Sequence, residues 1–221
     1  MDLPKFPPPL RKNDGLFLYG ATQHLPWVFA YEQDRVEVIH GPACKPEKEI
    51  NLDLCDQDKV PVIKRRGGGG TVVLSPGMVI TIVAGLRRRE DSIASLFSRI
   101  HLAMISLLGE YASHLAIQEK GLSDLAIDGK KVLGSSLYLS QRPLRYYYQS
   151  SLMVDSELQL IERYLHHPPK EPQYRGARPH LEFCTTLSRE NAAQSTSGIV
   201  SLFNRELKQR LVEWFDLGHW R

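Results

Sequence analysis

Four consecutive glycines, Gly67–Gly70, interrupt the most β-prone stretch of this chain. Val60–Ile63 precede them and Thr71–Leu74 follow, so the glycines are expected to join two strands. Lys64, Arg65 and Arg66 place fixed positive charge directly before a backbone without side chains. Glycine permits close approach, and free N–H groups beside guanidinium groups can bind phosphate or carboxylate. A Walker phosphate loop is not indicated, because that motif ends in Gly-Lys-Ser/Thr and opens a helix. The alternative is a flexible glycine turn with solvated arginines.

Length and composition predict one main domain at residues 16–221, preceded by a proline-rich extended arm at residues 1–15. The formal charge of +3 is only mildly basic, which does not favour nucleic acid as a partner. Three cysteines at wide spacings indicate neither a disulfide framework nor a zinc motif. With no signal-peptide pattern and no apolar run of membrane-spanning length, we expect a cytoplasmic protein without a membrane partner.

The first half of the domain is expected to contain short strands at residues 16–19, 27–30 and 36–39. Ser75-Pro76-Gly77 predicts a hairpin between residues 71–74 and 78–84. Apolar residues at helical spacing then predict the main packing helix from Ile93, with Asp91 or Ser92 as N-cap. His101 is expected on its solvent side.

The second half alternates as strands at residues 114–118, 125–127, 131–139 and 146–154, with a hairpin turn at Asp128-Gly129. A short helix is expected at residues 156–165. A final amphipathic helix is expected at residues 198–215, and its buried stripe comprises Ile199, Leu202, Phe203, Leu207, Leu211 and Trp214. These elements indicate an α+β fold.

Lys131 lies just after the Asp-Gly turn, where simple alternation puts it on one face with Leu133, opposite Val132. A lysine on a half-buried strand needs an anion nearby, because an unpaired buried ammonium is costly. The adjacent Lys130 is expected to be solvated. Gly134-Ser135-Ser136 follow, and again permit a ligand to approach the backbone.

Two segments together carry a resemblance: Arg65–Val72 with Ser75-Pro76-Gly77, and Ser123-Asp124-Leu125 with Gly129–Ser135. In this order and spacing, the sequence resembles the lipoate-protein ligase and octanoyltransferase superfamily over about residues 36–190, with biotin protein ligases as more distant relatives. The resemblance implies an α+β domain with a mixed, mainly antiparallel sheet and flanking helices. It further implies that ATP, with Mg²⁺ bound transiently, activates lipoate or octanoate as an acyl-adenylate. The acyl group would then pass to a lysine of a lipoyl-acceptor protein domain.

The resemblance also implies roles for individual residues. Lys131 would be the catalytic cation, placed between the acyl carbonyl and the phosphate. The predicted substrate- and nucleotide-binding positions are Arg65, Arg66, Gly68, Gly69, Gly70, Thr71, Asp124, Gly134, Ser135 and Ser136. Among these, Asp124 would bind ATP or its magnesium, and no resident metal site is predicted.

The chain departs from the family pattern at Leu74 and Gln149, where many members carry histidine. Residues 1–35 show no amphipathic helix, which leaves room for an accessory chain that completes the site. An ATP-independent octanoyltransferase is the first alternative, although neither position expected for its nucleophile holds a cysteine, and Cys184 reads as a small buried thiol. A non-catalytic acyl- or lipoyl-binding protein of the same fold is the second. Arg175 and Arg178 are expected to be solvated or to contact an acidic acceptor domain.

Overall fold

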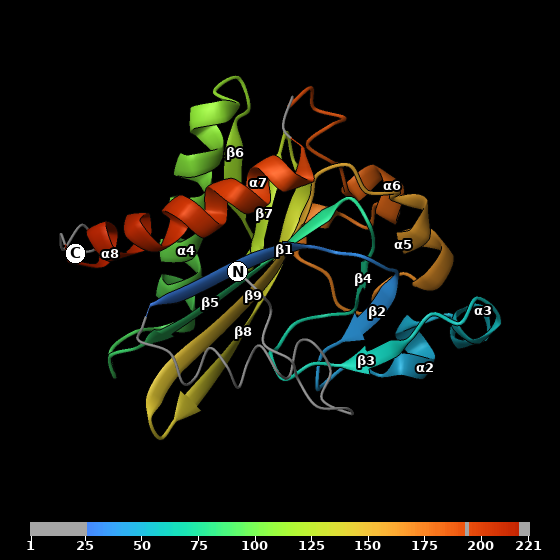
Figure 1. Ribbon diagram of the computed structural model, residues 1–221. Helices are drawn as coiled ribbons and strands as arrows, with labels where there is room; N and C mark the ends of the chain where they lie inside the picture. The colour runs from blue at the N-terminus through green and yellow to red at the C-terminus, as the bar shows by residue number, and fades with distance from the viewer. Residues whose placement is uncertain (1–25, 193–194, 217–221) are drawn as a thin grey trace.

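The computed structural model describes residues 26–192 and 195–216, and a six-stranded antiparallel sheet forms its centre (Figure 1). The strands lie in the order β1-β5-β9-β8-β7-β6. Their bounds are β1 Trp27–Glu32, β5 Met78–Leu86, β6 Ile117–Lys120, β7 Asp124–Ile127, β8 Lys130–Gln141 and β9 Leu144–Met153. The predicted strands at residues 27–30, 78–84 and 114–154 are thus confirmed, with shifted ends. The arm at residues 1–15 and the strand at 16–19 lie outside the described residues.

A smaller sheet has the order β3-β2-β4 and contains β2 Glu37–His40, β3 Val62–Lys64 and β4 Val72–Leu74. Strand β2 pairs parallel with β3 and antiparallel with β4. Short helices accompany it: α2 Pro46–Glu49, α3 Leu52–Gln57, α5 Gln159–Tyr164, the 3-10 turn η1 Gln173–Arg175 and α6 His180–Phe183. The fold is therefore α+β with a mixed, mainly antiparallel sheet arrangement, as predicted.

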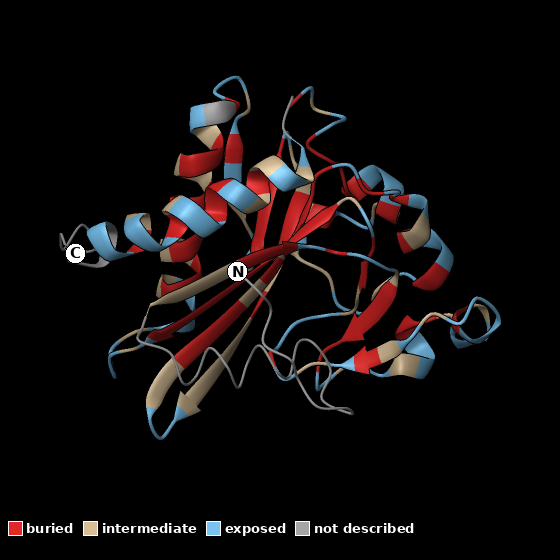
Figure 2. Ribbon diagram, in the orientation of Figure 1, coloured by how far each residue is buried: buried red, intermediate tan, exposed pale blue. Residues whose placement is uncertain are grey.

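Strand β5 is buried along all but its last residue because both faces of the large sheet are covered (Figure 2). Val79 and Val83 pack toward helix α4, Ile93–Tyr111, and toward the C-terminal helical segments. Ile80 and Ile82 pack instead against the small sheet and its short helices. Helices therefore cover one face of the large sheet, and the small sheet with its short helices covers the other.

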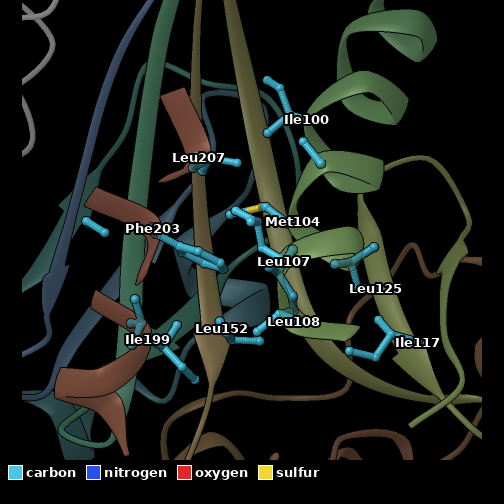
Figure 3. Packing of buried hydrophobic residues seen from close by; sticks show 14 of the residues in the cluster. Ile100, Met104, Leu107, Leu108, Ile117, Leu125, Leu152, Ile199, Phe203 and Leu207 are labelled. Carbon is cyan, nitrogen blue, oxygen red and sulfur yellow. The ribbon is translucent and has the colours of Figure 1, made fainter. Parts of the chain in front are cut away.

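Helix α4 begins where Ser92 accepts a hydrogen bond from the Ser95 N–H at 3.0 Å, which confirms Ser92 as the N-cap. Its apolar face is fully buried at Ile100, Met104 and Leu107, which lie against the sheet (Figure 3). The helix is long and apolar enough to pass a length-and-composition test for a membrane span. A core helix of a globular domain passes the same test, and this one packs in a core.

The C-terminal helix runs through α7 Thr196–Leu202, a π-helical turn η2 Phe203–Leu207, and α8 Lys208–Asp216. The predicted stripe is buried at Ile199, Leu202, Phe203, Leu207 and Leu211, whereas the Trp214 side chain lies outside the described part. The widened turn presents Asn204 to edge strand β1, where its amide bonds both the N–H and the C=O of Ala30 at 2.8 Å. The helix therefore also protects that edge.

One local prediction about a connection is wrong. Residues 71–74 and 78–84 do not form a hairpin, because β4 pairs with β2 whereas β5 pairs with β1 and β9. Ser75-Pro76-Gly77 instead carries the chain from one sheet to the other, with Gly77 at φ +84° packed against the Asp155 backbone. The short helix expected at 156–165 begins only at Gln159.

His101 is fully buried, so its predicted solvent position is also wrong. Its ring lies 5.6 Å from that of Phe97 and 5.8 Å from that of Tyr148. The histidine is tolerated there because both the large sheet and edge strand β6 offer it polar partners, which are described below.

Candidate functional site

The hairpin of β7 and β8 carries the predicted lysine. Asp128 and Gly129 both have positive φ, at 48° and 73°, as a two-residue turn with inverted backbone twist requires. The Asp-Gly prediction is confirmed. This tight turn places Asp124 near the start of β7 and Lys131 near the start of β8 on neighbouring strands.

A β-bulge sets the direction of Lys131. Lys131 pairs with Ala126 and Leu133 with Leu125, so Val132 is one extra residue on β8. Val132 and Leu133 are consequently both buried in the helix-side core. The prediction that Lys131 and Leu133 share a face is wrong, because alternation assumes a regular ladder.

Lys131 shares its face with Gly134 instead. A Cβ on Gly134 would lie 2.7 Å from the Lys131 Nζ and 2.8 Å from its Cε. The missing side chain gives the ammonium its space, so glycine is needed here for steric reasons.

Asp124 is the anion that Lys131 requires: Nζ and Oδ1 are 2.8 Å apart, with side-chain exposures of 21% and 8%. The second oxygen, Oδ2, accepts a hydrogen bond from the Tyr174 hydroxyl at 2.8 Å. Burial, together with the Asp124 charge, raises the pKa of Tyr174, so this hydroxyl remains a donor. Lys131 is thus held in one orientation by the buried Asp124 carboxylate, which is itself fixed by the hydrogen bond from Tyr174.

The Arg65 side chain forms hydrogen bonds with the backbone of the glycine run. Its guanidinium donates to the carbonyls of Gly68 at 3.0 Å and Gly70 at 2.7 Å, and to Ile39 at 3.3 Å. Burial lowers the pKa of this guanidinium, but an arginine remains protonated in proteins. Arg66, by contrast, is exposed. Binding of a ligand anion by Arg65 and Arg66 stays a prediction.

The glycine run lies against β8 just beyond Gly134. Gly67 is buried, and a Cβ there would meet the Ser136 hydroxyl at 2.9 Å, while the Gly68 N–H donates to the Leu137 carbonyl at 3.3 Å. Gly68 and Gly70 have open space where a side chain would be. The run therefore meets the same strand that carries Lys131.

Thr71, at the end of the run, donates its hydroxyl to Glu49 at 2.7 Å. Burial alone would raise the pKa of the Glu49 carboxyl, but hydrogen bonds from Thr71, Cys44 and the Lys45 N–H more than offset it, and the pKa is lowered. The anionic Glu49 anchors the end of the glycine run to helix α2.

Ser135 points its hydroxyl toward α4 and not toward the small sheet. It donates to the Ser123 carbonyl at 2.7 Å, so the His101 Nε2, 3.0 Å away, carries the proton that completes the pair. The His101 Nδ1 lies 3.3 Å from Glu119. These contacts fix the peptide before Asp124. Sequence reasoning missed His101, whose position amid an apolar helix face was the available signal.

Two adjoining cavities lie between the sheets. One, of about 40 Å³, is lined by several of the predicted binding residues and by Leu74 and Gln149, the two positions where the chain departs from the family pattern. The other, of about 100 Å³, is lined by Thr71 and Lys131. The cavities share Val72, Gly134 and Ser151. The predicted residues that line the first are Arg65, Gly134, Ser135 and Ser136, whereas Arg66, Gly68, Gly69, Gly70 and Asp124 line neither.

The segment after α5 supplies further residues to this site, of which only His180 was expected from the sequence to approach a ligand phosphate. Arg175, His180, Phe183 and Cys184 line the cavity of Lys131. Arg175 is only 4% exposed, so the expectation that it is solvated is wrong. Cys184 is buried as expected, and burial raises the pKa of its thiol although Lys131 and Arg175 act in the opposite direction.

Fold and site together define the class: an α+β domain in which a carboxylate-paired lysine lines one of two adjoining cavities between two sheets, and a glycine run packs against the strand that carries this lysine. The chain belongs to the lipoyl protein ligase A/B catalytic domain family, whose model matches residues 17–216.

Individual relatives agree with this assignment. The lipoate–protein ligase of Streptococcus pyogenes is 27% identical over 151 residues, which is 68% of this chain but 42% of that protein. The bipartite lipoate protein ligase of Thermoplasma acidophilum superposes with a TM-score of 0.69 at 20% identity, covering 90% of this chain and 84% of that one. A lipoate-protein ligase A bound with ATP gives 0.68 at 20% identity, with 90% and 85% coverage. At these identities, the two structures show a shared fold.

Proposed function

We propose that this protein activates lipoate or octanoate with ATP as an acyl-adenylate and transfers the acyl group to a lysine of a lipoyl-acceptor protein domain. The supporting observation is that Lys131, paired with Asp124, lines a cavity adjoining the one beside the glycine run. Joining a carboxylate to a triphosphate brings two anions together, so a cation fixed beforehand lowers the barrier. The names of the relatives support lipoate and ATP as substrates.

Lys131 has the central role in this proposal. Its ammonium would contact the acyl carbonyl and the phosphate, and stabilise the charge that develops in both half-reactions. Asp124 would orient the ammonium, and Gly134 would leave room for it. Because these groups are held by a hairpin and a bulge, little reorganisation is needed when substrate binds.

Mg²⁺ enters the proposal with the nucleotide. Both Asp124 oxygens already have partners, Lys131 and Tyr174, and the described residues contain no group of three or more metal-binding side chains. Mg²⁺ commonly binds through substrate phosphates with one or two carboxylates. We therefore treat Mg²⁺ as part of the ATP substrate, and Asp124 is the carboxylate proposed to contact it.

The acyl chain is proposed to occupy the cavity beside the glycine run, where Ile39, Leu74 and Ile80 form apolar walls. Leu74 and Gln149, the two departures from the family pattern, both line this cavity. They would therefore contact the part of the substrate in which lipoate and octanoate differ. We therefore propose that Leu74 and Gln149 determine the preference between lipoate and octanoate.

An ATP-independent octanoyltransferase is the second candidate, because Cys184 lies in the cavity of Lys131 and forms a parallel bridge with it. A nucleophilic cysteine acts as the thiolate, and burial raises the pKa of the Cys184 thiol. This favours the ATP-dependent route. A non-catalytic acyl-binding protein of the same fold remains the third candidate.

The proposed setting is the cytoplasm, with an acceptor domain as partner and no nucleic acid or membrane. The match spans 42% of the Streptococcus relative's length. An accessory chain is also part of the proposal, and the Thermoplasma ligase, which is described as bipartite, supports it.

The test is to incubate the protein with ATP, Mg²⁺, lipoate or octanoate, and an apo lipoyl domain, and to measure pyrophosphate release and the acceptor's mass. The proposal expects both signals, with Cys184→Ser unchanged. Acyl transfer from a carrier thioester without ATP, abolished by Cys184→Ser, would favour the octanoyltransferase. Ligand binding without turnover, even with an accessory chain added, would favour the binding protein.

A further inference from the structure

The segment from Pro172 to Thr185 is tied onto the hairpin that carries Lys131. The Tyr174 hydroxyl bonds Asp124, and the Arg178 Nη2 donates to the Gly129 carbonyl at 2.9 Å. Further along, the Thr185 N–H donates to the Lys131 carbonyl at 2.8 Å. These contacts from both ends of the segment fix its side chains relative to the lysine.

Arg175 lies in the middle of this segment and is buried, with a side-chain exposure of 5%. Its Nε bonds the Arg178 carbonyl at 3.0 Å and lies 3.2 Å from the Glu171 carboxylate. The guanidinium carbon lies 4.8 Å from the centre of the Phe183 ring, a cation–π contact. The plane and direction of the guanidinium are thus set by three neighbours.

One terminal nitrogen of this ordered group has no partner. The Arg175 Nη2 is buried and forms no hydrogen bond with any described residue. A buried N–H of a charged group is costly when unsatisfied, and native structures rarely leave one without a functional or solvent partner. Arg175 lines the cavity that Lys131 also lines, so an anion bound there could satisfy both cations.

The two cations are built alike. Each has one carboxylate, Asp124 for Lys131 and Glu171 for Arg175. Glu171 is shared with His167, 3.0 Å away, so it does not belong to Arg175 alone. Although each cation already has one carboxylate, Arg175 retains an unpartnered Nη2 and lines the cavity.

We propose that Arg175 is a second phosphate-binding cation of this site, which holds a phosphate group of the nucleotide opposite Lys131. The guanidinium fork can bind two oxygens of a phosphate or of a carboxylate in one plane while its Nε remains engaged, so the titrations below compare phosphate ligands with the carboxylate of the acyl substrate. The inference rests on the proposed function, since it assigns a part of the same nucleotide to a new residue.

The experiment compares Arg175→Gln with the wild type by calorimetric titration of Mg²⁺–ATP, pyrophosphate and octanoate. We expect the affinity for ATP and pyrophosphate to fall about 10- to 100-fold, the range for one hydrogen bond to a charged group, and the affinity for octanoate to stay within about twofold. Arg189→Gln removes the same charge from an exposed position and should leave all three unchanged. The pyrophosphate titration does not depend on turnover, so it tests Arg175 even if adenylate formation is not observed.

Arg175→Lys is the second variant, because it retains a cation and an aliphatic stem over Phe183 if the glutamine variant does not fold. It should recover part of the pyrophosphate affinity but not the full value, since an ammonium cannot form the fork. Wild-type affinity for ATP and pyrophosphate in a folded Arg175 variant would overturn the proposal. So would an equal loss of octanoate and phosphate binding, which would indicate a structural role.

Discussion

Replacing Gly134 by alanine tests how Lys131 is held. The new Cβ would lie 2.7 Å from the Lys131 Nζ, well inside contact distance, while the obstacle is the flexible end of a side chain and not backbone. The backbone should therefore be kept, and the ammonium should move away from Asp124. The change perturbs the geometry of the site without removing its charge.

The stability cost follows from two terms. Forcing Lys131 from its rotamer costs about 0.5–1.5 kcal/mol. Weakening its pair with the buried Asp124 adds to this, although less than the roughly 3–5 kcal/mol seen when a buried pair loses one partner entirely. We expect the free energy of unfolding to fall by about 1–3 kcal/mol. The rate of adenylate formation should fall about 10²- to 10³-fold, as when one preorganised charge stabiliser is lost.

The assay pairs urea unfolding with pyrophosphate release under saturating ATP and acyl substrate. Gly109→Ala is the matched control, because a Cβ at this helical position has nothing within 4 Å. That variant should be slightly more stable and equally active, since alanine is the better helix former. Full activity in Gly134→Ala would refute the argument that the space at this glycine positions the lysine.

Two further predictions concern the surroundings of the site. Gly41→Ala should lower the free energy of unfolding by about 1–3 kcal/mol in urea titrations, because its Cβ would overlap the Gly69 carbonyl, and an unchanged midpoint would contradict the close packing. The pKa of Glu119 is lowered, and the largest cause is the interaction with His101. Burial acts in the opposite direction, and the hydrogen bond from Ser98 lowers the pKa further. A carboxyl group whose pKa is lowered by folding stabilises the folded state at pH values above its ordinary pKa of about 4.3. The wild type should therefore be more stable than Glu119→Gln at neutral pH. That advantage should vanish as pH falls through the lowered pKa, and a difference that persists at lower pH would contradict it.

Local chemistry determined what could be predicted from the sequence. The Asp128-Gly129 turn and the Ser92 cap were predictable because each depends on its own dihedrals and nearest backbone groups. The candidate site residues Lys131 and Asp124 were predicted from a resemblance and from the need of a half-buried lysine for an anion, and the structure places the two charged groups 2.8 Å apart.

Features that depend on distant partners were missed. The bulge at Val132 arises from pairing between β7 and β8, which alternation cannot show. His101 is buried because Ser135 and Glu119, on other elements, satisfy it. Arg175 seemed to lie in a solvated loop because nothing nearby in the sequence indicates that this segment folds back over the Lys131 hairpin.

The most direct test of the central claim is single-turnover pyrophosphate release by Lys131→Ala, compared with Lys130→Ala on the exposed neighbour. If the paired ammonium stabilises the charge that develops between acid and nucleotide, the Lys131 variant should remain folded and lose at least about 10²-fold in rate. The Lys130 variant should keep the wild-type rate. A folded Lys131→Ala protein that releases pyrophosphate at the wild-type rate would contradict the claim.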